Sequence, residues 1–465
     1  MTDCSYIQSL KIKGYRGFSE GKIISFASPN GEPGSGLTVV VGANNSGKTT
    51  IIESLMAVSQ KQSPTFSEGK RNKGAENRVR LELTDSEGGE VIVETVESGG
   101  SETQKTGTTK PGTSDIFVLK SRRIFSPFFG KNSLDRGQHI NSHQNLESNR
   151  SAQQGLEGRI FAINKDPVKR ANFTSEIAKI IDPPPDWTIE QSDQGQYYLK
   201  YMDSGFSHNS DGVGEGIISL LFIVDALYDS KPGDLIVIDE PELSLHPQLQ
   251  NRIRDYLLEK SRDRQIAIST HSPKFIDWAA IAKGAEIIRI VKESGQSSVY
   301  SLSRPTRNKI SALLSDLNNP HILGTDANEI FFLYDSIVLL EGQEDVMYLP
   351  KALESLEKRL NAEIYGWGVG GADKMEIIAS ILKDLGYKKV AGLLDNDKSS
   401  SIPNLQRQFP EYKFVAQPAD DIRNNPRRQK KGKTTLLLKK NIDVDPRFVD
   451  EMKSTIDELN YYFDN

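Results

Sequence analysis

The chain has 465 residues, of which 26% are charged and 36% hydrophobic, and its formal net charge at pH 7 is −5. We expect two or three domains that each bury a core, and the acidic balance excludes a uniformly basic nucleic-acid coat while allowing a local basic patch. The single cysteine, Cys4, and the absence of a long apolar run exclude an intrachain disulfide, a signal peptide and a membrane span, so we expect a cytoplasmic protein.

The first predicted elements lead into a phosphate-binding loop. Two short strands are expected within residues 5–27, and Thr38–Thr50 then reads TVVVGANNSGKTT. This is the pattern G-x-x-x-x-G-K-[ST] between a buried strand and a helix N-terminus, where backbone N–H groups and the helix dipole cradle phosphates. We expect Lys48 to reach the β- and γ-phosphates and Thr49 to bind Mg²⁺. The predicted ATP-binding residues of this loop are Gly42, Asn44, Asn45, Ser46, Gly47, Lys48, Thr49 and Thr50.

The middle of the chain contains a helical insert between β-like segments. Residues 60–113 alternate β-like runs with loops rich in Ser, Gly and Thr. Apolar residues return to helical spacing between about residues 150 and 185, where a run of three prolines interrupts the pattern. Whether this helical insert forms a dimer contact stays open. A glycine-rich turn, Ser210–Gly216, then precedes an apolar helix at Ile217–Leu227. An ordinary glycine-rich helix entry remains the alternative reading of that turn.

Two acids close the next buried strand, Leu235–Ile238. A parallel strand delivers carboxylates at its carboxyl end, where open α/β sheets bind ligands. We expect Asp239 to enter the Mg²⁺ shell and Glu240 to polarise the attacking water. His271 follows another buried strand, Gln265–Ser269, and from that sheet edge it could contact a γ-phosphate.

Together these motifs resemble the ABC-type ATPases of the SMC, RecF and OLD group. Gly42–Thr49 matches their Walker A motif, Asp239 and Glu240 their Walker B motif, and His271 their switch histidine. Ser210 and Gly212 match their signature loop, and Ser244–Pro247 resembles their D-loop. In this group the signature loop of one subunit caps ATP bound to another, so the resemblance implies a homodimer or a higher homo-oligomer.

A second strand–helix alternation starts at Ser336 and carries two acidic motifs. An apolar strand ends at Glu341 and is followed by a glycine turn and Asp345, while a later strand ends at Asp395 and Asp397. Period-2 geometry would point Asp395 and Asp397 to the same side of that strand. Clustered carboxylates suit Mg²⁺ or Mn²⁺ and can hold ions for phosphoryl displacement, whereas independent surface acids are the alternative.

This second alternation resembles a Toprim domain, the metal-dependent module of topoisomerases, primases and OLD-family nucleases. Glu341 matches the Toprim glutamate, Asp395 and Asp397 match its D-x-D motif, and in OLD-like proteins the acid at the position of Asp345 is also a metal ligand. Asp420 and Asp421 fall where that family carries a further acid. A lysine stabilises the transition state in OLD-like nucleases, and several lysines here qualify.

A basic run lies beyond the acidic motifs. Seven of the fourteen residues in 427–440 are basic and none is acidic. It is either a solvated tail face or a patch that contacts phosphates beside a nuclease site.

The sequence thus predicts an α/β protein with an ABC/SMC-RecF-like ATPase domain, residues 1–330, before a Rossmann-like Toprim domain, residues 331–465, with a basic C-terminal extension. The resemblance to the OLD family implies an ATP-regulated, Mg²⁺- or Mn²⁺-dependent nuclease that cleaves DNA, most readily double-stranded DNA. It also implies a role in bacterial anti-phage defence, as in retron or Gabija systems, beside a partner such as a reverse transcriptase with noncoding RNA or a helicase. A RecF-like repair ATPase and a non-catalytic scaffold with a degenerate Toprim domain are the alternatives. No membrane partner is expected.

Overall fold

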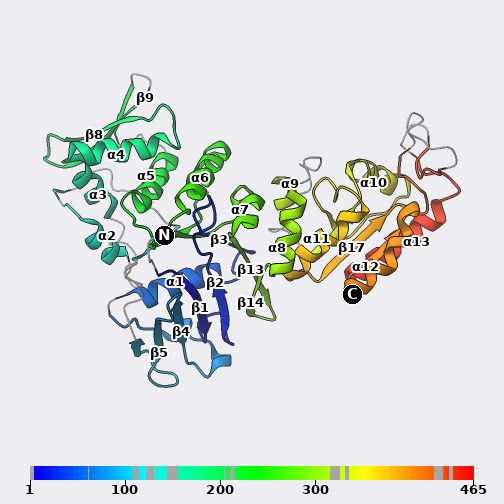
Figure 1. Cartoon of the computed structure of the whole chain (residues 1–465), viewed down its shortest axis with the longest axis horizontal. Helices are drawn as coiled ribbons and strands as arrows, with labels where there is room; N and C mark the ends of the chain where they lie inside the picture. Colours follow the sequence, from blue (N-terminus) through cyan, green and yellow to red (C-terminus); the bar gives the residue numbers. More distant parts are fainter. Residues whose placement is uncertain are drawn as a thin grey trace. The chain divides into compact units, whose positions relative to one another are not determined.

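The computed structural model describes residues 5–60, 62–107, 115–121, 130–131, 133–143, 155–203, 206–209, 215–314, 325–329, 335–423, 433–438 and 443–465. The predicted signature residues Ser210 and Gly212, and most of the basic run 427–440, lie outside these ranges. The chain separates into two compact units, Met1–Val299 and Tyr300–Asn465 (Figure 1).

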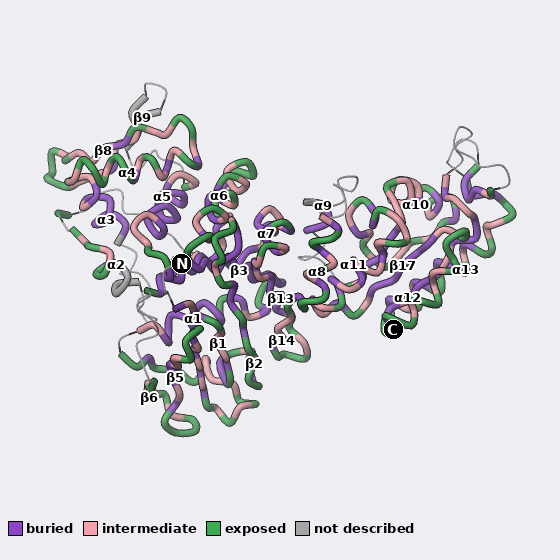
Figure 2. Tube along the Cα trace, viewed as in Figure 1, coloured by how far each residue is buried: buried purple, intermediate pink, exposed green. Residues whose placement is uncertain are grey.

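A six-stranded sheet organises the N-terminal unit, in the strand order β14-β13-β3-β12-β11-β7. Its strands are β3 (Leu37–Val41), β7 (Ile116–Leu119), β11 (Leu235–Asp239), β12 (Gln265–Ser269), β13 (Glu286–Glu293) and β14 (Gln296–Ser301). The pairs from β13 through β7 are parallel, and β3, β11 and β12 are buried along their whole length. The buried trace of β3 can be followed in Figure 2. Continuous apolar strands are typical of parallel sheets covered on both faces. The parallel direction brings the segments after β3, β11 and β12 to one edge.

A second, antiparallel sheet in the order β2-β1-β4-β5-β6 shares a core with the first. Its strands are β1 (Ile7–Lys13), β2 (Lys22–Ser25), β4 (Arg80–Asp85), β5 (Glu90–Thr95) and β6 (Thr103–Gly107). Buried and half-buried positions alternate in β4 and β5, because one face packs inward and the other is partly solvated. Helix α1 (Lys48–Ser59) contacts strands of both sheets, so the helix that follows the phosphate loop is held from two sides.

The remaining elements of this unit are mostly helical. They are α2 (Arg136–His143), α3 (Gly155–Asn164), α4 (Pro167–Ala178), α5 (Glu215–Tyr228), α6 (Pro247–Lys260), α7 (Trp278–Lys283), a small sheet of β8 (Asp186–Gln191), β9 (Tyr197–Asp203) and β10 (Phe206–Asn209), and the 3₁₀ turns η1 (Glu68–Lys70), η2 (Lys73–Ala75) and η4 (Pro273–Phe275). Helices α3 and α4 occupy the region of the expected insert and pack on each other and on α5. A dimerising role for them stays a prediction.

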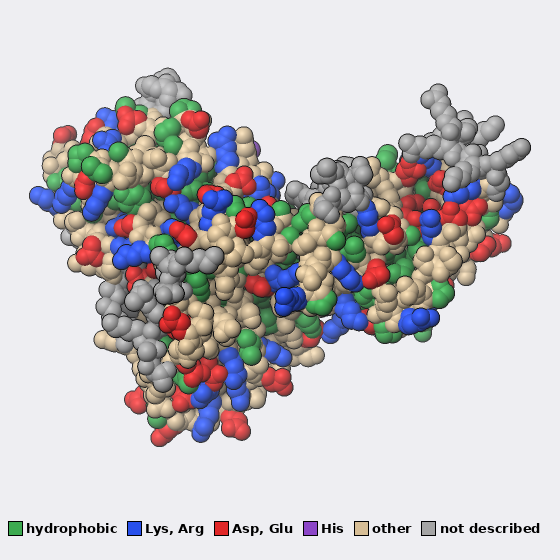
Figure 3. Space-filling model, viewed as in Figure 1, with side chains coloured by type: hydrophobic (Ala, Val, Ile, Leu, Met, Phe, Trp, Pro, Cys, Tyr) green, Lys and Arg blue, Asp and Glu red, His purple; other side chains and the backbone are tan. Residues whose placement is uncertain are grey.

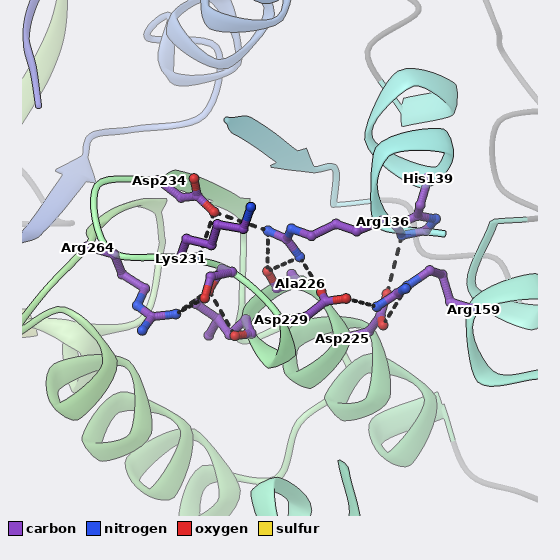
Figure 4. A network of polar contacts seen from close by, with 11 residues as sticks. Arg136, His139, Arg159, Asp225, Ala226, Asp229, Lys231, Asp234 and Arg264 are labelled. Atoms are coloured by element: carbon purple, nitrogen blue, oxygen red, sulfur yellow. Dashed lines mark hydrogen bonds and ion pairs between the residues drawn. The ribbon is translucent and has the colours of Figure 1, made fainter. Parts of the chain in front are cut away.

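A buried ionic network joins α2 and α3 to α5 (Figure 4). The Arg159 guanidinium lies 3.1 Å from Asp225 and 2.9 Å from Asp229, and Arg136 lies 2.8 Å from Asp229. His139 Nε2 lies 3.4 Å from the Asp225 carboxylate, which is only 2% exposed. Burial raises the pKa of Asp225 to about 6, although the positive charge of Arg159 acts in the opposite direction. Basic side chains from α2 and α3 therefore stabilise the buried carboxylate of Asp225.

Replacing Arg159 by methionine should destabilise the chain more at pH 8 than at pH 5. Removing one partner of a buried ion pair costs about 3–5 kcal/mol, because the other charge is left uncompensated. The pKa of Asp225 is already raised in the folded state, so the folded chain takes up a proton as the pH falls and part of the loss is recovered. Thermal unfolding at both pH values measures the effect. Arg262→Met, which removes a surface arginine 3.3 Å from Glu259, is the control, and an equal loss at both pH values would contradict the account.

The C-terminal unit has one parallel sheet in the order β16-β15-β17-β18. Its strands are β15 (Ser336–Leu340), β16 (Glu363–Ile364), β17 (Lys389–Leu394) and β18 (Lys413–Ala416), and its helices are α8 (Arg304–Leu314), α9 (Thr325–Glu329), α10 (Gln343–Ser355), α11 (Ala372–Asp384), α12 (Ile402–Gln408) and α13 (Val449–Asp464), with a 3₁₀ turn η6 (Asn396–Ser401). Apolar side chains of α10 and α13 form a core with β15 and β17. The expected strand–helix alternation is confirmed.

Helix α8 belongs to the C-terminal unit, so contacts divide the chain earlier than the boundary expected at residues 330–331. The Lys309 ammonium on α8 lies 2.8 Å from Glu376 on α11, and Ser303 N donates a hydrogen bond to Asp384 at 2.9 Å. Acidic and basic side chains are interspersed over most of the drawn surface, with a denser acidic group on the C-terminal unit (Figure 3). None of the helices in the described ranges is both long and apolar enough to cross a membrane.

Candidate functional sites

The phosphate loop connects β3 to α1 in a closely packed, left-handed backbone. Gly42 has φ 149° and Gly47 has φ 122°, values that L side chains rarely adopt. A Cβ atom on Gly42 would lie 2.3 Å from the carbonyl oxygen of Ile290. Ser297 on β14 donates a hydrogen bond from its hydroxyl to the Ser46 carbonyl at 2.6 Å, a contact that no local sequence pattern indicated. These contacts hold the backbone of the loop in place.

The polar groups of this loop fit a bound triphosphate. Lys48 is only 6% exposed, and its Nζ donates to the carbonyls of Gly42 at 2.8 Å and Ala43 at 3.1 Å. Burial lowers the pKa of Lys48, while Glu240 and Asp239 oppose that shift. Within the described residues the buried hydroxyl of Ser46 has no hydrogen-bond partner. An orphaned donor and a buried cation beside a helix N-terminus are what a phosphate would satisfy.

The other predicted residues of the loop differ in exposure. Asn44, Asn45 and Thr49 are exposed, so the Thr49 hydroxyl is open to a metal ion. Thr50 is 3% exposed and lies within α1, so its side chain faces the protein interior.

Asp239 and Glu240 leave β11 beside the strand that leads to His271. Ser269 at the end of β12 pairs in register with Asp239 and donates its hydroxyl to the Asp239 carboxylate. Glu240 has φ 48°, and its N–H donates to the Ser269 carbonyl at 2.9 Å, so the turn is held in a strained conformation that redirects the side chain. His271 Nε2 lies 3.7 Å from the Glu240 carboxylate. Burial, followed by the nearby charge of Lys48, lowers the pKa of His271, which favours the neutral imidazole.

Glu242 is a site residue that the sequence reasoning missed. Its carboxylate accepts hydrogen bonds from the His271 N–H at 2.6 Å and from the Thr270 hydroxyl at 2.9 Å. Burial raises the pKa of Glu242, and the hydrogen bond from His271 acts against that rise. Glu242 therefore ties the segment after β12 to the segment after β11 and positions His271. Its only sequence signal was a third acid directly after Asp239, Glu240 and Pro241.

The chain beside the predicted signature residues contacts the D-loop-like segment. Ser210 and Gly212 lie outside the described residues, but Glu215 at the start of α5 accepts a hydrogen bond from the Ser244 hydroxyl at 2.9 Å. A Cβ atom on Gly216 would lie 2.8 Å from the Ser244 carbonyl, so only glycine allows this approach. The described end of the predicted signature segment, Glu215 and Gly216, thus contacts the D-loop-like segment within one chain.

In the C-terminal unit, carboxylates gather at the carboxyl ends of two neighbouring parallel strands. Glu341 follows β15 and Asp395 follows β17, and the Asp395 N–H donates to Glu341 Oε1 at 2.9 Å. Asp345 lies in the first turn of α10 and accepts from the Gly342 N–H at 2.9 Å. The structure therefore brings these three predicted residues to one edge of the sheet, as expected from its parallel topology.

Burial and mutual repulsion disfavour ionisation of these acids. Burial raises the pKa of Asp395 to about 9, and the charges of Asp345 and Glu341 add to the effect. The pKa of Asp345 rises to about 7 for the same reasons, with contributions from Glu341 and Asp421, and that of Glu341 is also raised by burial and by Asp397. A bound cation would remove this repulsion.

The backbone that positions Asp397 near the other acids differs from the strand geometry that we expected. Strand β17 ends at Leu394, and Asp397 lies in the first turn of η6. The expectation that Asp395 and Asp397 share one side of a strand is therefore wrong, because the backbone turns directly after Leu394. Asp397 is oriented instead by Lys433, whose ammonium hydrogen-bonds to its carboxylate and whose pKa is raised by that bond.

Two more residues lie at this edge: Gln417, which had no local sequence signal, and Asp421, one of the two acids expected here. Gln417 follows β18 and donates its side-chain amide to Asp395. The charge of Asp421 contributes to the raised pKa values of Asp345 and Asp395. The Asp420 carboxylate instead accepts hydrogen bonds from the Thr434 N–H and hydroxyl, both at 2.9 Å.

The residue types at this edge fit a divalent cation, although their arrangement is not a closed ligand set. Among the side chains that the structure describes, no three of His, Cys, Asp or Glu converge closely enough to hold a metal ion. Carboxylate oxygens are nevertheless the ligands that Mg²⁺ and Mn²⁺ prefer.

Family profiles match both units of the chain. The profile described as "AAA domain, putative AbiEii toxin, Type IV TA system" matches residues 37–277, just over half of the 465 residues. The profile described as "Overcoming lysogenization defect protein-like, TOPRIM domain" matches residues 332–397, which include all four acids predicted for the second site.

Curated relatives include two nucleases. The chain is 31% identical to the OLD nuclease of Thermus scotoductus (strain ATCC 700910 / SA-01) over 40% of its own length and 36% of that protein. It is 24% identical to the Old nuclease of Escherichia phage P2, covering 56% of itself and 45% of the relative. The Septu protein PtuA of Bacillus thuringiensis is also 24% identical, with 59% and 74% covered. The chain thus spans less than half the length of either nuclease.

Solved structures similar to the chain include SMC head domains. The SmcHead bound to the C-winged helix domain of ScpA is 17% identical with a TM-score of 0.43, and the match covers 64% of this chain and 99% of that one. The SMC head domain from Thermotoga maritima is 16% identical with a TM-score of 0.39, covering 64% and 99%. The strand order, the phosphate loop and the two profile matches show the family: the chain belongs to the AAA family described as putative AbiEii toxin, Type IV TA system, and carries an OLD-like TOPRIM domain after its ATPase domain.

Proposed function

We propose that the chain binds and hydrolyses ATP and is a divalent-metal-dependent nuclease that cleaves phosphodiester bonds in DNA. The observation that carries the proposal is the placement of Glu341, Asp345 and Asp395 at the carboxyl edge of a parallel sheet, where the Asp395 N–H donates to Glu341 at 2.9 Å and Asp345 accepts from the Gly342 N–H at 2.9 Å. The two relatives named as OLD nucleases support it.

The two sites have separate chemical roles in this proposal. Gly42–Thr49 would bind the triphosphate, Thr49 and Asp239 its Mg²⁺, and Glu240 would polarise the attacking water beside His271. Glu341, Asp345, Asp395 and Asp397 would hold Mg²⁺ or Mn²⁺, which when bound supplies positive charge and lowers the pKa of water. Around it, Gln417 orients Asp395 and Lys433 orients Asp397.

ATP binding would control the nuclease through self-association. By resemblance to ABC-type ATPases, the segment with Ser210 and Gly212 would cap ATP on a second copy, which makes a homodimer or a higher homo-oligomer the active form. An anti-phage role, with a partner such as a reverse transcriptase with noncoding RNA or a helicase, is part of the proposal by resemblance alone. Counting phage plaques on cells that express the chain would check that role.

The experiment that tests the activity uses supercoiled plasmid. The chain is incubated with the plasmid in Mg²⁺, in Mn²⁺ and in EDTA, each with and without ATP, and nicked and linear products are quantified. Cleavage that requires the metal supports the proposal. ATP hydrolysis without cleavage under every condition would instead favour a repair ATPase or a scaffold with a degenerate Toprim domain.

Lys433→Met should lower the cleavage rate about 100-fold, the loss typical of removing one donor that stabilises developing charge. Among the described residues, Lys433 is a lysine that hydrogen-bonds to a proposed metal ligand, Asp397, and that bond raises the pKa of its ammonium. Single-turnover cleavage at saturating protein measures the rate apart from DNA binding. Lys413→Met is the matched control, because Lys413 is similarly exposed and ion-paired, 2.5 Å from Glu458. Equal rates for the two variants would show that Lys433 has no part in the chemistry.

A further inference from the structure

Trp367 lies at the same edge of the sheet as the acidic cluster. Strand β16 is an outer strand of the parallel C-terminal sheet, next to β15, and Trp367 follows its carboxyl end by three residues. Glu341 follows the carboxyl end of β15, so the two residues emerge from adjacent strands in the same direction. Neighbouring strands lie about 4.8 Å apart, which places the Trp367 backbone beside the Glu341 turn.

The loop that carries Trp367 is anchored to that turn. A Cβ atom on Gly368 would lie 2.7 Å from the backbone carbon of Gly342, so these two backbones are in direct contact. The Gly371 N–H donates to the Glu341 carbonyl at 2.8 Å, and the Val369 N–H donates to the Leu340 carbonyl at 2.8 Å. The loop that contains Trp367 is therefore held by backbone contacts with Leu340, Glu341 and Gly342.

Trp367 is exposed where the chain's other two tryptophans are buried. Its side chain is 41% exposed, whereas Trp187 is 4% exposed and Trp278 is 3% exposed. A large aromatic ring beside a polar site can stack on a planar ligand, which carboxylates and ammonium groups cannot do. Aromatic side chains stack on bases of any sequence, because every base has a π-face.

We propose that Trp367 stacks on an unpaired nucleobase of the DNA strand held at the acidic cluster. This inference rests on the proposed nuclease function and deepens it. A base inside a duplex must leave the stack before a side chain can cover its face. The preferred substrate is therefore DNA with an unpaired base next to the scissile phosphate, as in a single-stranded tail or a junction, in place of an uninterrupted duplex.

The charges around the cluster agree with this assignment. Lys398 lies in η6, which directly follows β17, and Lys433 hydrogen-bonds to Asp397 in the same turn. Cations for a phosphate backbone therefore lie on the β17 side of Glu341. Trp367 emerges from β16, on the opposite side of β15. A strand could thus place its phosphates toward the lysines and its base toward the tryptophan.

The test measures binding without cleavage. Calcium replaces Mg²⁺, a gel confirms that the DNA stays intact, and three fluorescein-labelled DNAs are compared: a blunt duplex, the same duplex with a single-stranded tail, and that tail made of abasic sites. Anisotropy gives the dissociation constant. Intrinsic tryptophan fluorescence, measured with unlabelled DNA, reports on Trp367, and the Trp367→Phe variant gives the background from Trp187 and Trp278.

The tailed duplex should bind more tightly than the blunt or abasic DNA and should quench the Trp367 signal. Trp367→Ala should weaken binding of the tailed duplex by about 5- to 150-fold, the range of base–aromatic stacking, and Trp367→Phe should weaken it less. Tyr461→Ala is the control, because Tyr461 is an aromatic residue 73% exposed on α13. Folding of each variant is checked by circular dichroism.

Three outcomes would overturn the stacking proposal: equal binding of tailed and abasic DNA, unchanged binding by Trp367→Ala, or quenching that follows protein concentration without DNA, which would assign Trp367 to a contact between copies. Failure of the nuclease function is a separate result, because it is decided by metal-dependent cleavage of the plasmid and of the tailed duplex and not by binding in calcium.

Discussion

Asp395→Ala should abolish metal-dependent DNA cleavage while leaving ATP hydrolysis unchanged. Asp395 lies at the centre of the acidic cluster, where Glu341 accepts its N–H and Gln417 donates to its carboxylate. Loss of a residue that only supports a metal ligand costs about 10- to 100-fold, so loss of a proposed ligand should exceed 100-fold. Plasmid cleavage in Mg²⁺ and in Mn²⁺ measures the effect, beside phosphate release from ATP.

The stability of this variant separates lost chemistry from lost folding. Burial and repulsion by neighbouring carboxylates oppose ionisation of Asp395, so its removal should not lower the melting temperature in metal-free buffer. Asp457→Asn, which removes a carboxylate ion-paired with Lys358 on the surface, is the matched control and should cut DNA normally. Wild-type cleavage by Asp395→Ala would refute the acidic cluster as the nuclease site.

Glu240→Gln should abolish ATP turnover while retaining ATP binding. The side chain lies 3.7 Å from His271 at the edge that also carries Lys48, and glutamine keeps its size while losing the basic oxygen. General-base assistance of this kind contributes about 100- to 10,000-fold, which sets the expected loss. Phosphate release gives the turnover, and binding of a fluorescent ATP analogue gives the affinity.

This variant also tests the proposed association. If ATP lies between two copies, Glu240→Gln with ATP should form a long-lived dimer, detected by light scattering, that the wild type forms only briefly. Glu259→Gln, an exposed acid on α6, is the control for removing one charge. Unchanged hydrolysis by Glu240→Gln would reject Glu240 as the residue that polarises water.

The sequence was sufficient for features whose residues are close together in the chain. The phosphate loop, the buried strand that ends at Asp239 directly before Glu240, and the strand–helix alternation after Ser336 are all confirmed in their local form. Each depends on apolar runs and turn residues within about a dozen positions, and such patterns act through local backbone preferences and burial. Parallel topology then made it predictable that acids at strand ends would meet.

Only the tertiary structure decided how those residues are held. Glu242 accepts a hydrogen bond from His271, which is 29 residues away in the chain. Ser297 donates a hydrogen bond to Ser46 of the phosphate loop, which is 251 residues away. Lys433 reaches Asp397 across 36 residues, and the backbone turn after Leu394 replaced the strand geometry expected there. Side-chain identity shows which groups can bind or ionise. Which of them meet depends on the packing of distant segments, and no local pattern records that packing.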